Sequence, residues 1–278
     1  EGGSSDLRKA IAKKHEISLN QIICGNGSDE IFSLLMSAFT EAGDEIIYTE
    51  HGFLMYKFYA LVNGVKPVVA REVNLKTDIT NILNQVTDKT RIVFVANPNN
   101  PTGSYVTHDE LVSLRESLRS DIILVIDGAY AEYVTESDYE DGFALVRQYE
   151  NVVATRTFSK IYGLASLRIG YCFASDSIID VLNRVRGPFN VNLAAQMAAL
   201  AAIEDKAFCE QSRSHNDKWL AIFQEEFAKL NVTFIDSVAN FFLIRSDEAK
   251  LDQYREFLSE NKLKIRKVAA YGLPDYLR

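Results

Sequence analysis

Short apolar runs rich in β-branched residues alternate with helical patterns through most of the chain, and this alternation most constrains the fold. Several runs are apolar throughout, as expected for a sheet that helices cover on both faces. Helices are predicted at 29–39 and 109–118, the second opened by a capping box with Thr107 at the N-cap and Glu110 at N3. The pattern predicts an α/β fold with a mainly parallel sheet and ligands at the carboxyl ends of its strands. The predicted strands are 22–24, 45–48, 65–69, 90–95, 122–126, 152–154 and 169–173.

The pattern changes near residue 205, where a long amphipathic helix is predicted over 205–230. Its apolar stripe consists of Trp219, Ile222, Phe223, Phe227 and Leu230. Strands at 232–234, 241–244 and 263–266 and a helix at 251–261 are predicted after it. We therefore expect a large α/β domain over 1–205 and a smaller α+β domain over 206–278 that is incomplete at its C-terminal end.

Composition is that of an ordinary globular protein, with 47% hydrophobic and 24% charged residues. The net charge of -8 argues against a nucleic-acid surface, where a basic stripe is expected. No run approaches the ~18 apolar residues of a membrane span, so no membrane partner is expected. Cys24, Cys172 and Cys209 lack metal-ligand spacing, and we expect all three to be buried in a cytoplasmic, reducing compartment. Because the chain lacks a starting methionine and stops inside a predicted strand, we expect a fragment with both native ends missing.

The segment TRTFSKIYGLASLRIG at 155–170 contains the strongest chemical signal, Lys160. Small and hydroxylated residues flank Lys160, and Asp127 ends the most hydrophobic predicted strand. Such a lysine, with a carboxylate on a neighbouring strand, suits an aldehyde cofactor that forms a Schiff base. We expect Lys160 to be buried, which disfavours its ammonium form, and Asp127 to need a cationic partner. The alternatives are a surface lysine and an aspartate that caps the next helix.

A glycine-rich turn, Gly25-Asn-Gly-Ser-Asp-Glu30, follows one predicted strand and opens a helix. The backbone N–H groups of Ser28 and Asp29 are therefore expected to point at an anion. At Asp29 the amide, rather than the carboxylate, is the expected contact. Alone, such a turn is a weak signal.

Three motifs resemble the fold-type I pyridoxal-phosphate-dependent aminotransferases: Asn97-Pro-Asn-Asn-Pro-Thr-Gly103, Asp127-Gly-Ala-Tyr130, and Ser159-Lys160 followed by Arg168. Glu50-His-Gly-Phe53, the segment 155–160, and Tyr271-Gly-Leu-Pro274 with Arg278 narrow the resemblance to the histidinol-phosphate aminotransferase family. The resemblance covers essentially the whole chain. It implies a mainly parallel seven-stranded sheet between helices, a pyridoxal 5'-phosphate cofactor, and a homodimer with active sites shared across the interface.

The resemblance also implies the cofactor-binding and catalytic residues. Lys160 forms the Schiff base and then transfers protons, Asp127 pairs with the pyridinium nitrogen, and Tyr130 contacts the phenolic oxygen together with Asn100. Phe53 stacks on the ring. The residues expected at the phosphate are Ser28, Asp29, Thr157, Ser159 and Arg168. The alternatives are a conformational Asn-Pro turn for Asn100 and core packing for Tyr130 and Phe53.

Substrate binding is assigned by the same resemblance to Arg278 for a carboxylate, Arg266 for the phosphate of histidinol phosphate, and Asn240 for orientation. The implied reaction, in histidine biosynthesis, converts imidazole-acetol phosphate and L-glutamate to L-histidinol phosphate and 2-oxoglutarate. One site must accept a phosphate in one half-reaction and a carboxylate in the other, which suits two arginines. For Arg266 and Asn240 the alternative is an ordinary surface or turn residue.

Three other functions remain compatible with the motifs. The scaffold could transaminate aromatic amino acids in a pocket with Phe53 and Tyr56, or decarboxylate a phosphorylated amino acid. It could also be a non-catalytic sensor domain that binds pyridoxal phosphate, although no basic helix-turn-helix segment is present. Two departures from the family pattern are the missing N-terminal lid, with its tyrosine, before Glu1, and Ser166 in place of the usual glycine, which we expect to be tolerated.

Overall fold

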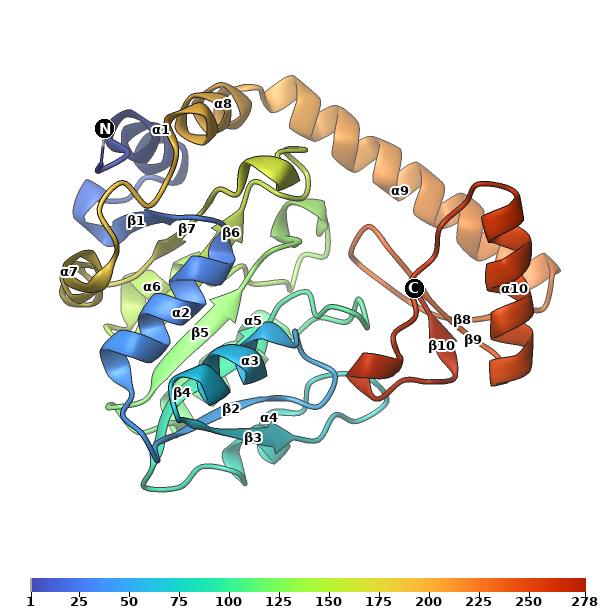
Figure 1. The fold of residues 1–278 in the computed structure, drawn as a ribbon, viewed down its shortest axis with the longest axis horizontal. Coiled ribbons are helices and arrows are strands. Elements are labelled where there is room, and N and C mark those ends of the chain that lie inside the picture. Colours follow the sequence, from blue (N-terminus) through green and yellow to red (C-terminus); the bar gives the residue numbers. More distant parts are fainter. Residues whose placement is uncertain (1) are drawn as a thin grey trace.

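A seven-stranded sheet forms the centre of the computed structural model, which describes residues 2–278 (Figure 1). The strand order is β1-β7-β6-β5-β4-β2-β3. Strands β2 to β6 pair in parallel, whereas β7 runs antiparallel to both β1 and β6. The mainly parallel seven-stranded sheet is therefore confirmed. Its strands are β1 (Ile22–Gly25), β2 (Glu45–Thr49), β3 (Lys66–Ala70), β4 (Thr90–Ala96), β5 (Ile123–Asp127), β6 (Val152–Thr157) and β7 (Gly170–Phe173).

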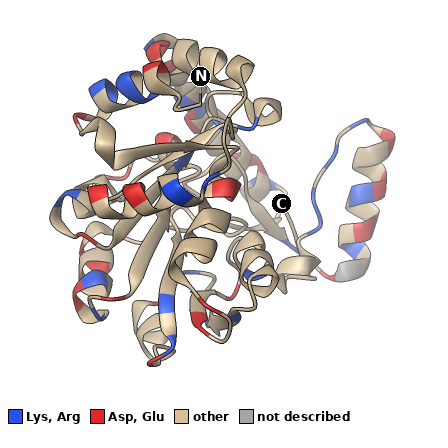
Figure 2. Ribbon diagram, turned by 60° about the vertical axis from the view of Figure 1, so that its left-hand side comes forward, with Lys and Arg blue, Asp and Glu red and all other residues tan. Residues whose placement is uncertain are grey.

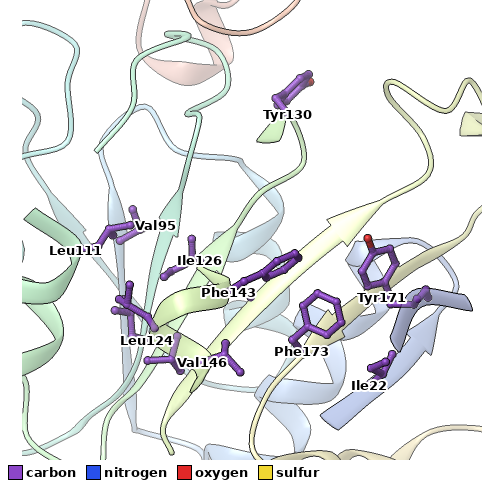
Figure 3. Packing of buried hydrophobic residues seen from close by; sticks show 14 of the residues in the cluster. Ile22, Val95, Leu111, Leu124, Ile126, Tyr130, Phe143, Val146, Tyr171 and Phe173 are labelled. Atoms are coloured by element: carbon purple, nitrogen blue, oxygen red, sulfur yellow. The ribbon is translucent and has the colours of Figure 1, made fainter. Parts of the chain in front are cut away.

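Helices cover both faces of this sheet, because its central strands turn successive apolar side chains to opposite sides. In β5, Leu124 and Ile126 belong to one core cluster, while Ile123 and Val125 belong to the other. Figure 3 shows part of the first cluster, where rings and aliphatic side chains from several elements meet. The helices on that face are α1 (Ser5–His15), α4 (Ile79–Leu83), α5 (His108–Ser117), α6 (Phe143–Gln148) and α8 (Leu193–Glu204). Those on the other are α2 (Ser28–Phe39), α3 (Met55–Val62) and α7 (Asp176–Val185).

Shorter features lie between these strands and helices and, for one turn, in the C-terminal part of the chain. The predicted capping box at the start of α5 is confirmed, since Thr107 and Glu110 each accept a hydrogen bond from the other's backbone N–H. Four 3₁₀ turns are η1 (Leu19–Gln21), η2 (Ala131–Tyr133), η3 (Ala165–Leu167) and η4 (Ala269–Tyr271).

The C-terminal part of the chain begins with the long helix α9 (Lys206–Lys229), which leads away from the large sheet (Figure 1). Strands β8 (Thr233–Ile235), β9 (Leu243–Arg245) and β10 (Tyr276–Leu277) form an antiparallel sheet beside α10 (Glu248–Glu260). The prediction of a strand over 263–266 is wrong, because this segment is a loop. Its partner β10 is only two residues long, so pairing there is limited to a bridge between Lys267 and Leu277 and two backbone hydrogen bonds between Arg266 and Arg278.

The apolar stripe of α9 is only partly covered by the small sheet. The helix is confirmed, but none of its described residues is buried, and Trp219 is 43% exposed. Aromatic rings of the helix contact rings of the small sheet and the residue before β9. The ring centroids of Phe223 and Phe242 are 6.0 Å apart, and those of Phe227 and Phe234 are 5.8 Å apart. The stripe therefore packs against the small sheet through Phe223 and Phe227.

Acidic and basic residues are interspersed along the helices (Figure 2). Among residues 2–278, no helix has the length and apolar character needed to cross a membrane. Cys24 and Cys172 are buried, and burial raises the pKa of the Cys24 thiol to about 12. The prediction that all three cysteines are buried is wrong for Cys209, which is half-buried because it lies on the open helix α9.

Candidate active site

A cavity of ≈ 170 Å³ lies at the carboxyl ends of β4, β5 and β6, beside the N-terminus of α2. This is the edge of the sheet at which open α/β folds bind ligands. All of the residues predicted to bind a cofactor line this one cavity: Ser28, Asp29, Phe53, Asn100, Asp127, Tyr130, Thr157, Ser159, Lys160 and Arg168. The structure therefore brings together side chains that are far apart in the sequence.

The turn between β1 and α2 forms one wall of the cavity and has free backbone donors, because the first N–H groups of a helix lack helical acceptors. Gly27 has a φ of 77°, and a Cβ there would lie 2.6 Å from Nη2 of Arg168. A Cβ on Gly170, at the start of β7, would lie 2.5 Å from the backbone nitrogen of Ser28. Glycine at these two positions therefore lets the turn close around the Arg168 guanidinium and against β7.

Arg168 brings a positive charge to this turn. Its Nη2 donates a hydrogen bond to Oδ2 of Asp29 at 2.8 Å, and its Nη1 donates to the carbonyl oxygen of Ala165 at 3.1 Å. The Asp29 carboxylate therefore orients the guanidinium, a contact that no sequence motif indicated. Close by, the N–H of Ser159 donates to Oγ1 of Thr157 at 3.1 Å. The turn thus combines backbone donors, hydroxyl groups and a guanidinium, which is a donor set suited to a phosphate.

Lys160 follows β6, and its Nζ lies 5.0 Å from the centroid of the Tyr130 ring. The prediction that Lys160 is buried is wrong, since the residue is half-buried. The physical reason is that its side chain lines the cavity, which leaves the amine open to a small molecule. An ammonium group over a tyrosine ring face is stabilised by cation–π attraction, which also orients the side chain.

Asp127 ends β5 and is 5% exposed. Tyr56 Oη donates a hydrogen bond to its Oδ2 at 2.6 Å, and Thr155 Oγ1 donates to its Oδ1 at 3.0 Å. Burial raises the pKa of Asp127, while the hydrogen bonds from Tyr56 and Thr155 oppose that shift. A cation facing the carboxylate would further favour its charged form.

Tyr56 lies where no sequence motif placed it. In the alternative of an aromatic aminotransferase it would line a substrate pocket with Phe53. Its ring does lie 5.7 Å from that of Phe53, but Tyr56 is only 1% exposed and is not among the residues that line the cavity. Its ring stacks on Phe94 with centroids 4.6 Å apart. Burial and the neighbouring Asp127 raise the pKa of its hydroxyl well above the usual value. A buried tyrosine hydroxyl needs a polar partner, and this requirement is the signal that could have linked Tyr56 to Asp127.

Arg278 reaches the site from the C-terminal part of the chain. Its Nη1 donates a hydrogen bond to Oδ1 of Asn100, and its guanidinium lies 4.8 Å from the ring centroid of Phe241. Tyr130 packs edge-on against the same ring at 5.1 Å. Arg278 therefore lies beside both residues that were expected to contact a cofactor oxygen.

None of the three predicted substrate residues, Arg278, Arg266 and Asn240, lines the cavity itself. Arg266 is exposed, and its backbone pairs with that of Arg278. Burial raises the pKa of Tyr271, and the charges of Arg278 and Arg266 oppose this shift. Asn240 Nδ2 donates to Tyr133 Oη at 3.4 Å and lines a separate groove along α9.

A polar cluster joins the cavity wall to the C-terminal part of the chain. His51 Nδ1 lies 2.7 Å from the carbonyl oxygen of Tyr271. The backbone N–H of His51 and the side-chain Nδ2 of Asn99 each donate a hydrogen bond to Oε1 of Glu72 at 3.2 Å. Because His51 lies near Phe53 in the chain and Asn99 precedes Asn100, this cluster helps to fix the cavity wall. No local sequence pattern points to Glu72 as their common partner.

Arg156 is a buried cation behind the cavity, only 2% exposed. Its Nη2 lies 2.9 Å from Oδ2 of Asp141, and its Nη1 donates to the carbonyl oxygen of Thr155 at 2.7 Å. A Cβ on Gly128 would lie 1.9 Å from Nη1, so the guanidinium packs directly against the backbone that follows Asp127. Arg156 therefore packs against the segment between Asp127 and Tyr130 on the side away from the cavity and holds it in place.

Arg156→Leu is expected to lower the free energy of unfolding by about 3 kcal/mol, because it leaves the carboxylates of Asp141 and Glu132 without their cation. Urea unfolding of the purified protein at neutral pH measures this change. The control is Arg184→Leu, which breaks an exposed pair with Asp180 and should cost less than about 1 kcal/mol. Equal losses in the two variants would contradict a supporting role for Arg156.

The donors around the cavity fit a flat cationic ring that carries an aldehyde and a phosphate, as pyridoxal phosphate does. The turn at α2 and Arg168 could bind the phosphate, and the buried carboxylate of Asp127 could pair with the ring nitrogen. Phe53 offers an aromatic face, and the Lys160 amine is open to an aldehyde. Each chemical feature of that cofactor therefore has a matching group in the cavity.

Comparison with known proteins gives matches over the whole chain. Residues 2–278 match the family model described as aminotransferase class I and II. The chain is 49% identical over 281 residues to histidinol-phosphate aminotransferase from Rhodopseudomonas palustris (strain TIE-1), covering 100% of this chain and 77% of that relative. Histidinol-phosphate aminotransferase from Paramagnetospirillum magneticum (strain ATCC 700264 / AMB-1) is 45% identical over 284 residues, with the same coverage.

A solved structure shows the same fold. Histidinol-phosphate aminotransferase from Sinorhizobium meliloti, in complex with pyridoxal-5'-phosphate, superposes with a TM-score of 0.92 over 99% of this chain and 76% of that chain. Sequence identity to it is 24%, so this likeness supports the fold alone. The fold-type I architecture expected from the motifs is confirmed.

Proposed function

The chain belongs to the class I and II aminotransferases and, within them, to the histidinol-phosphate aminotransferase family, and we propose that it uses pyridoxal 5'-phosphate to make L-histidinol phosphate. The reaction takes imidazole-acetol phosphate and L-glutamate and releases 2-oxoglutarate, as a step of histidine biosynthesis. The observation that carries this proposal is the single cavity that joins Lys160, Asp127 and the turn at α2, with Arg278 beside it.

Pyridoxal phosphate, when bound, supplies an aldehyde that bonds to amines and a ring that withdraws electrons from the reacting carbon. In the proposed mechanism, Lys160 Nζ would hold the cofactor through its aldehyde and, when free, would hold and move a proton as general base and acid. Asp127 would pair with the ring nitrogen and favour its charged form. Asn100 Oδ1 accepts from Arg278, so its amide nitrogen, which also has Tyr271 as a hydrogen-bonding neighbour, would bind the phenolic oxygen together with the Tyr130 hydroxyl.

The phosphate is assigned to the turn at α2. The amides of Ser28 and Asp29 would donate to it, the hydroxyls of Thr157 and Ser159 would add neutral donors, and Arg168 would add the charge. Because Arg168 already binds the Asp29 carboxylate, its guanidinium is held in place before the phosphate arrives. Phe53 would stack on the ring.

The substrate is assigned to Arg278 and Arg266. Arg278 lies beside the cofactor residues, and its planar guanidinium can bind the carboxylate of glutamate with two hydrogen bonds. Arg266, on the adjacent backbone ladder, would bind the phosphate of histidinol phosphate. Asn240, near Tyr133 and Phe241, would orient the substrate at the edge of the site.

Three further properties are part of the proposal. Residues 1–205 would form the large domain and residues 206–278 part of the small one, with α9 as the connection. The protein would work in the cytoplasm as a homodimer with active sites shared across the interface. Large apolar side chains on the surface support dimer formation, among them Phe58, which is 53% exposed, and Leu193, which is 61% exposed.

Histidinol phosphate is expected to convert the bound cofactor to its amino form faster than phenylalanine or aspartate does, because Arg266, whose backbone pairs with that of Arg278, would bind its phosphate. Single-turnover absorbance changes of the holoenzyme with each amino donor measure this order. A faster reaction with phenylalanine would favour an aromatic aminotransferase. Release of carbon dioxide from a phosphorylated amino acid would favour a decarboxylase, and no turnover with any donor would favour a sensor.

A further inference from the structure

Glu30 ends the turn at 25–30 and has no part in the chemistry proposed above. Its Oε2 accepts a hydrogen bond from the N–H of Asn26 at 2.6 Å and another from Nδ2 of Asn190 at 2.7 Å. Asn190 Nδ2 also donates to the carbonyl oxygen of Cys24 at 3.1 Å. One carboxylate oxygen thus joins the start of the turn to the segment between α7 and α8.

The amide of Asn190 is itself fixed in orientation. Arg186 Nη1 donates to Oδ1 of Asn190 at 3.4 Å and to the carbonyl oxygen of Gly2 at 2.9 Å. A guanidinium can only donate and a carboxylate can only accept, so the amide can have only one orientation between Arg186 and Glu30. The result is a continuous chain of hydrogen bonds from residue 2 to the turn.

These contacts determine which backbone donors of the turn face the cavity. The N–H of Asn26 is bonded to Glu30, whereas Ser28 and Asp29 line the cavity. Glycines at 25 and 27 would otherwise give the turn wide conformational freedom. A Cβ on Gly25 would lie 3.3 Å from Glu30 Oε2, so the carboxylate packs closely against the backbone of the turn.

We infer that Glu30 and Asn190 are positioning residues that hold the turn at 25–29 in its anion-binding shape before the phosphate arrives. A preformed turn binds an anion without first losing conformational entropy, which increases affinity although no new contact is made. The inference rests on the proposed function, since it takes the phosphate of pyridoxal phosphate as the anion.

Simple electrostatics predicts the opposite effect for Glu30. Its negative charge lies near the phosphate turn, so its removal alone should strengthen the binding of an anion. A positioning role predicts weaker binding in Glu30→Ala, because the turn loses its fixed shape. The sign of the change therefore distinguishes the two effects.

The experiment titrates the apoprotein with pyridoxal phosphate and, separately, with pyridoxal, which lacks the phosphate, and follows the absorbance of the bound aldehyde. The ratio of the two Kd values isolates the contribution of the phosphate. Glu30→Ala is expected to weaken pyridoxal phosphate binding by about tenfold or more, the effect of losing hydrogen bonds to a charged group, with little change for pyridoxal. Glu30→Gln should stay close to wild type, because its amide oxygen can accept both bonds.

Asn190→Ala tests the same contact from outside the turn and α2, so the test does not depend on one variant folding. It should weaken pyridoxal phosphate binding severalfold and speed its dissociation, again without a matching change for pyridoxal. Asp176→Ala, which removes a carboxylate from the first turn of α7, is the matched control and should have no effect on the ratio.

Unchanged or tighter phosphate-dependent binding in both Glu30→Ala and Asn190→Ala would overturn the inference. So would a Glu30→Gln variant as weak as Glu30→Ala, because a side chain that can still accept both hydrogen bonds would then fail to hold the turn. Wild-type protein that binds neither compound would instead disprove the proposed cofactor, which keeps the two failures distinguishable.

Discussion

Lys160→Ala is expected to abolish transamination and to remove the absorbance band that pyridoxal phosphate gains when it bonds to the protein. The variant loses both the amine that binds the aldehyde and the group that moves the proton. General acid–base catalysis alone contributes up to about 10⁴-fold, so the loss in kcat/KM should be at least of that order. The other cavity residues are unchanged, so the cofactor should still bind through its phosphate and ring, at lower affinity.

The absorbance spectrum and the rate with histidinol phosphate and 2-oxoglutarate measure this prediction. The matched control is Lys57→Ala, an exposed lysine on α3 that should keep both band and rate. Added ethylamine should restore part of the proton transfer in Lys160→Ala, because a small amine can enter the space that the side chain leaves. A Lys160→Ala protein that retains the band and the wild-type rate would exclude Lys160 as the cofactor lysine.

The large sheet could be predicted from the sequence because its signal is local. Each central strand is a short apolar run, and the alternation of Ile123, Leu124, Val125 and Ile126 between two core clusters explains why no polar residue interrupts it. The segment 263–266, in which Leu263 and Ile265 alternate with Lys264 and Arg266, has the period of a half-buried strand but forms a loop, because its partner β10 pairs only briefly. Whether a strand forms there depends on a neighbour that a local pattern does not reveal.

The cavity could be predicted for a related reason. Asp127 ends one strand, and Lys160 and the turn at α2 follow two others. The carboxyl ends of strands that run in the same direction meet at one edge of the sheet. Asn100 and Phe53 were predicted from family motifs alone, because their position relative to the strands does not indicate a role in the site. The exposure of Lys160 could not be predicted, because it depends on the shape of the cavity.

Contacts between distant segments have no local sequence pattern that identifies both partners, and the need of a buried tyrosine hydroxyl for a polar group does not say which group it meets. Tyr56 lies in a helix, and only the packing of α3 against the sheet brings its hydroxyl to Asp127. Glu72 and Glu30 likewise meet their partners through loops whose paths follow from the assembled fold. These three residues act on the site through other side chains or backbone groups, and such roles depend on tertiary geometry.

Asp127→Asn is expected to reduce kcat/KM by about 10² to 10⁴, because breaking a buried ion pair costs about 3–5 kcal/mol. The substitution keeps the shape of the side chain but removes the charge that would pair with the ring nitrogen. Steady-state kinetics of the holoenzyme measure the loss, and cofactor content measured in parallel separates it from weaker binding. The control is Asp121→Asn, a change at an exposed carboxylate, which should keep the wild-type rate. A near-normal rate in Asp127→Asn would contradict the pairing.

Tyr56→Phe tests whether the hydrogen bond from Tyr56 keeps Asp127 charged. The hydrogen bond from Tyr56 lowers the pKa of Asp127 and opposes the upward shift caused by burial. Without it the pKa of Asp127 should rise, so the carboxylate should become protonated, and activity should fall, at a higher pH than in wild type. Above that pH Thr155 still donates and the charge remains, so Tyr56→Phe should lose only about tenfold, the effect of one hydrogen bond to a charged group. An acid limb of the pH–rate profile that stays in place would mean that Tyr56 packs beneath the site without affecting the charge of Asp127.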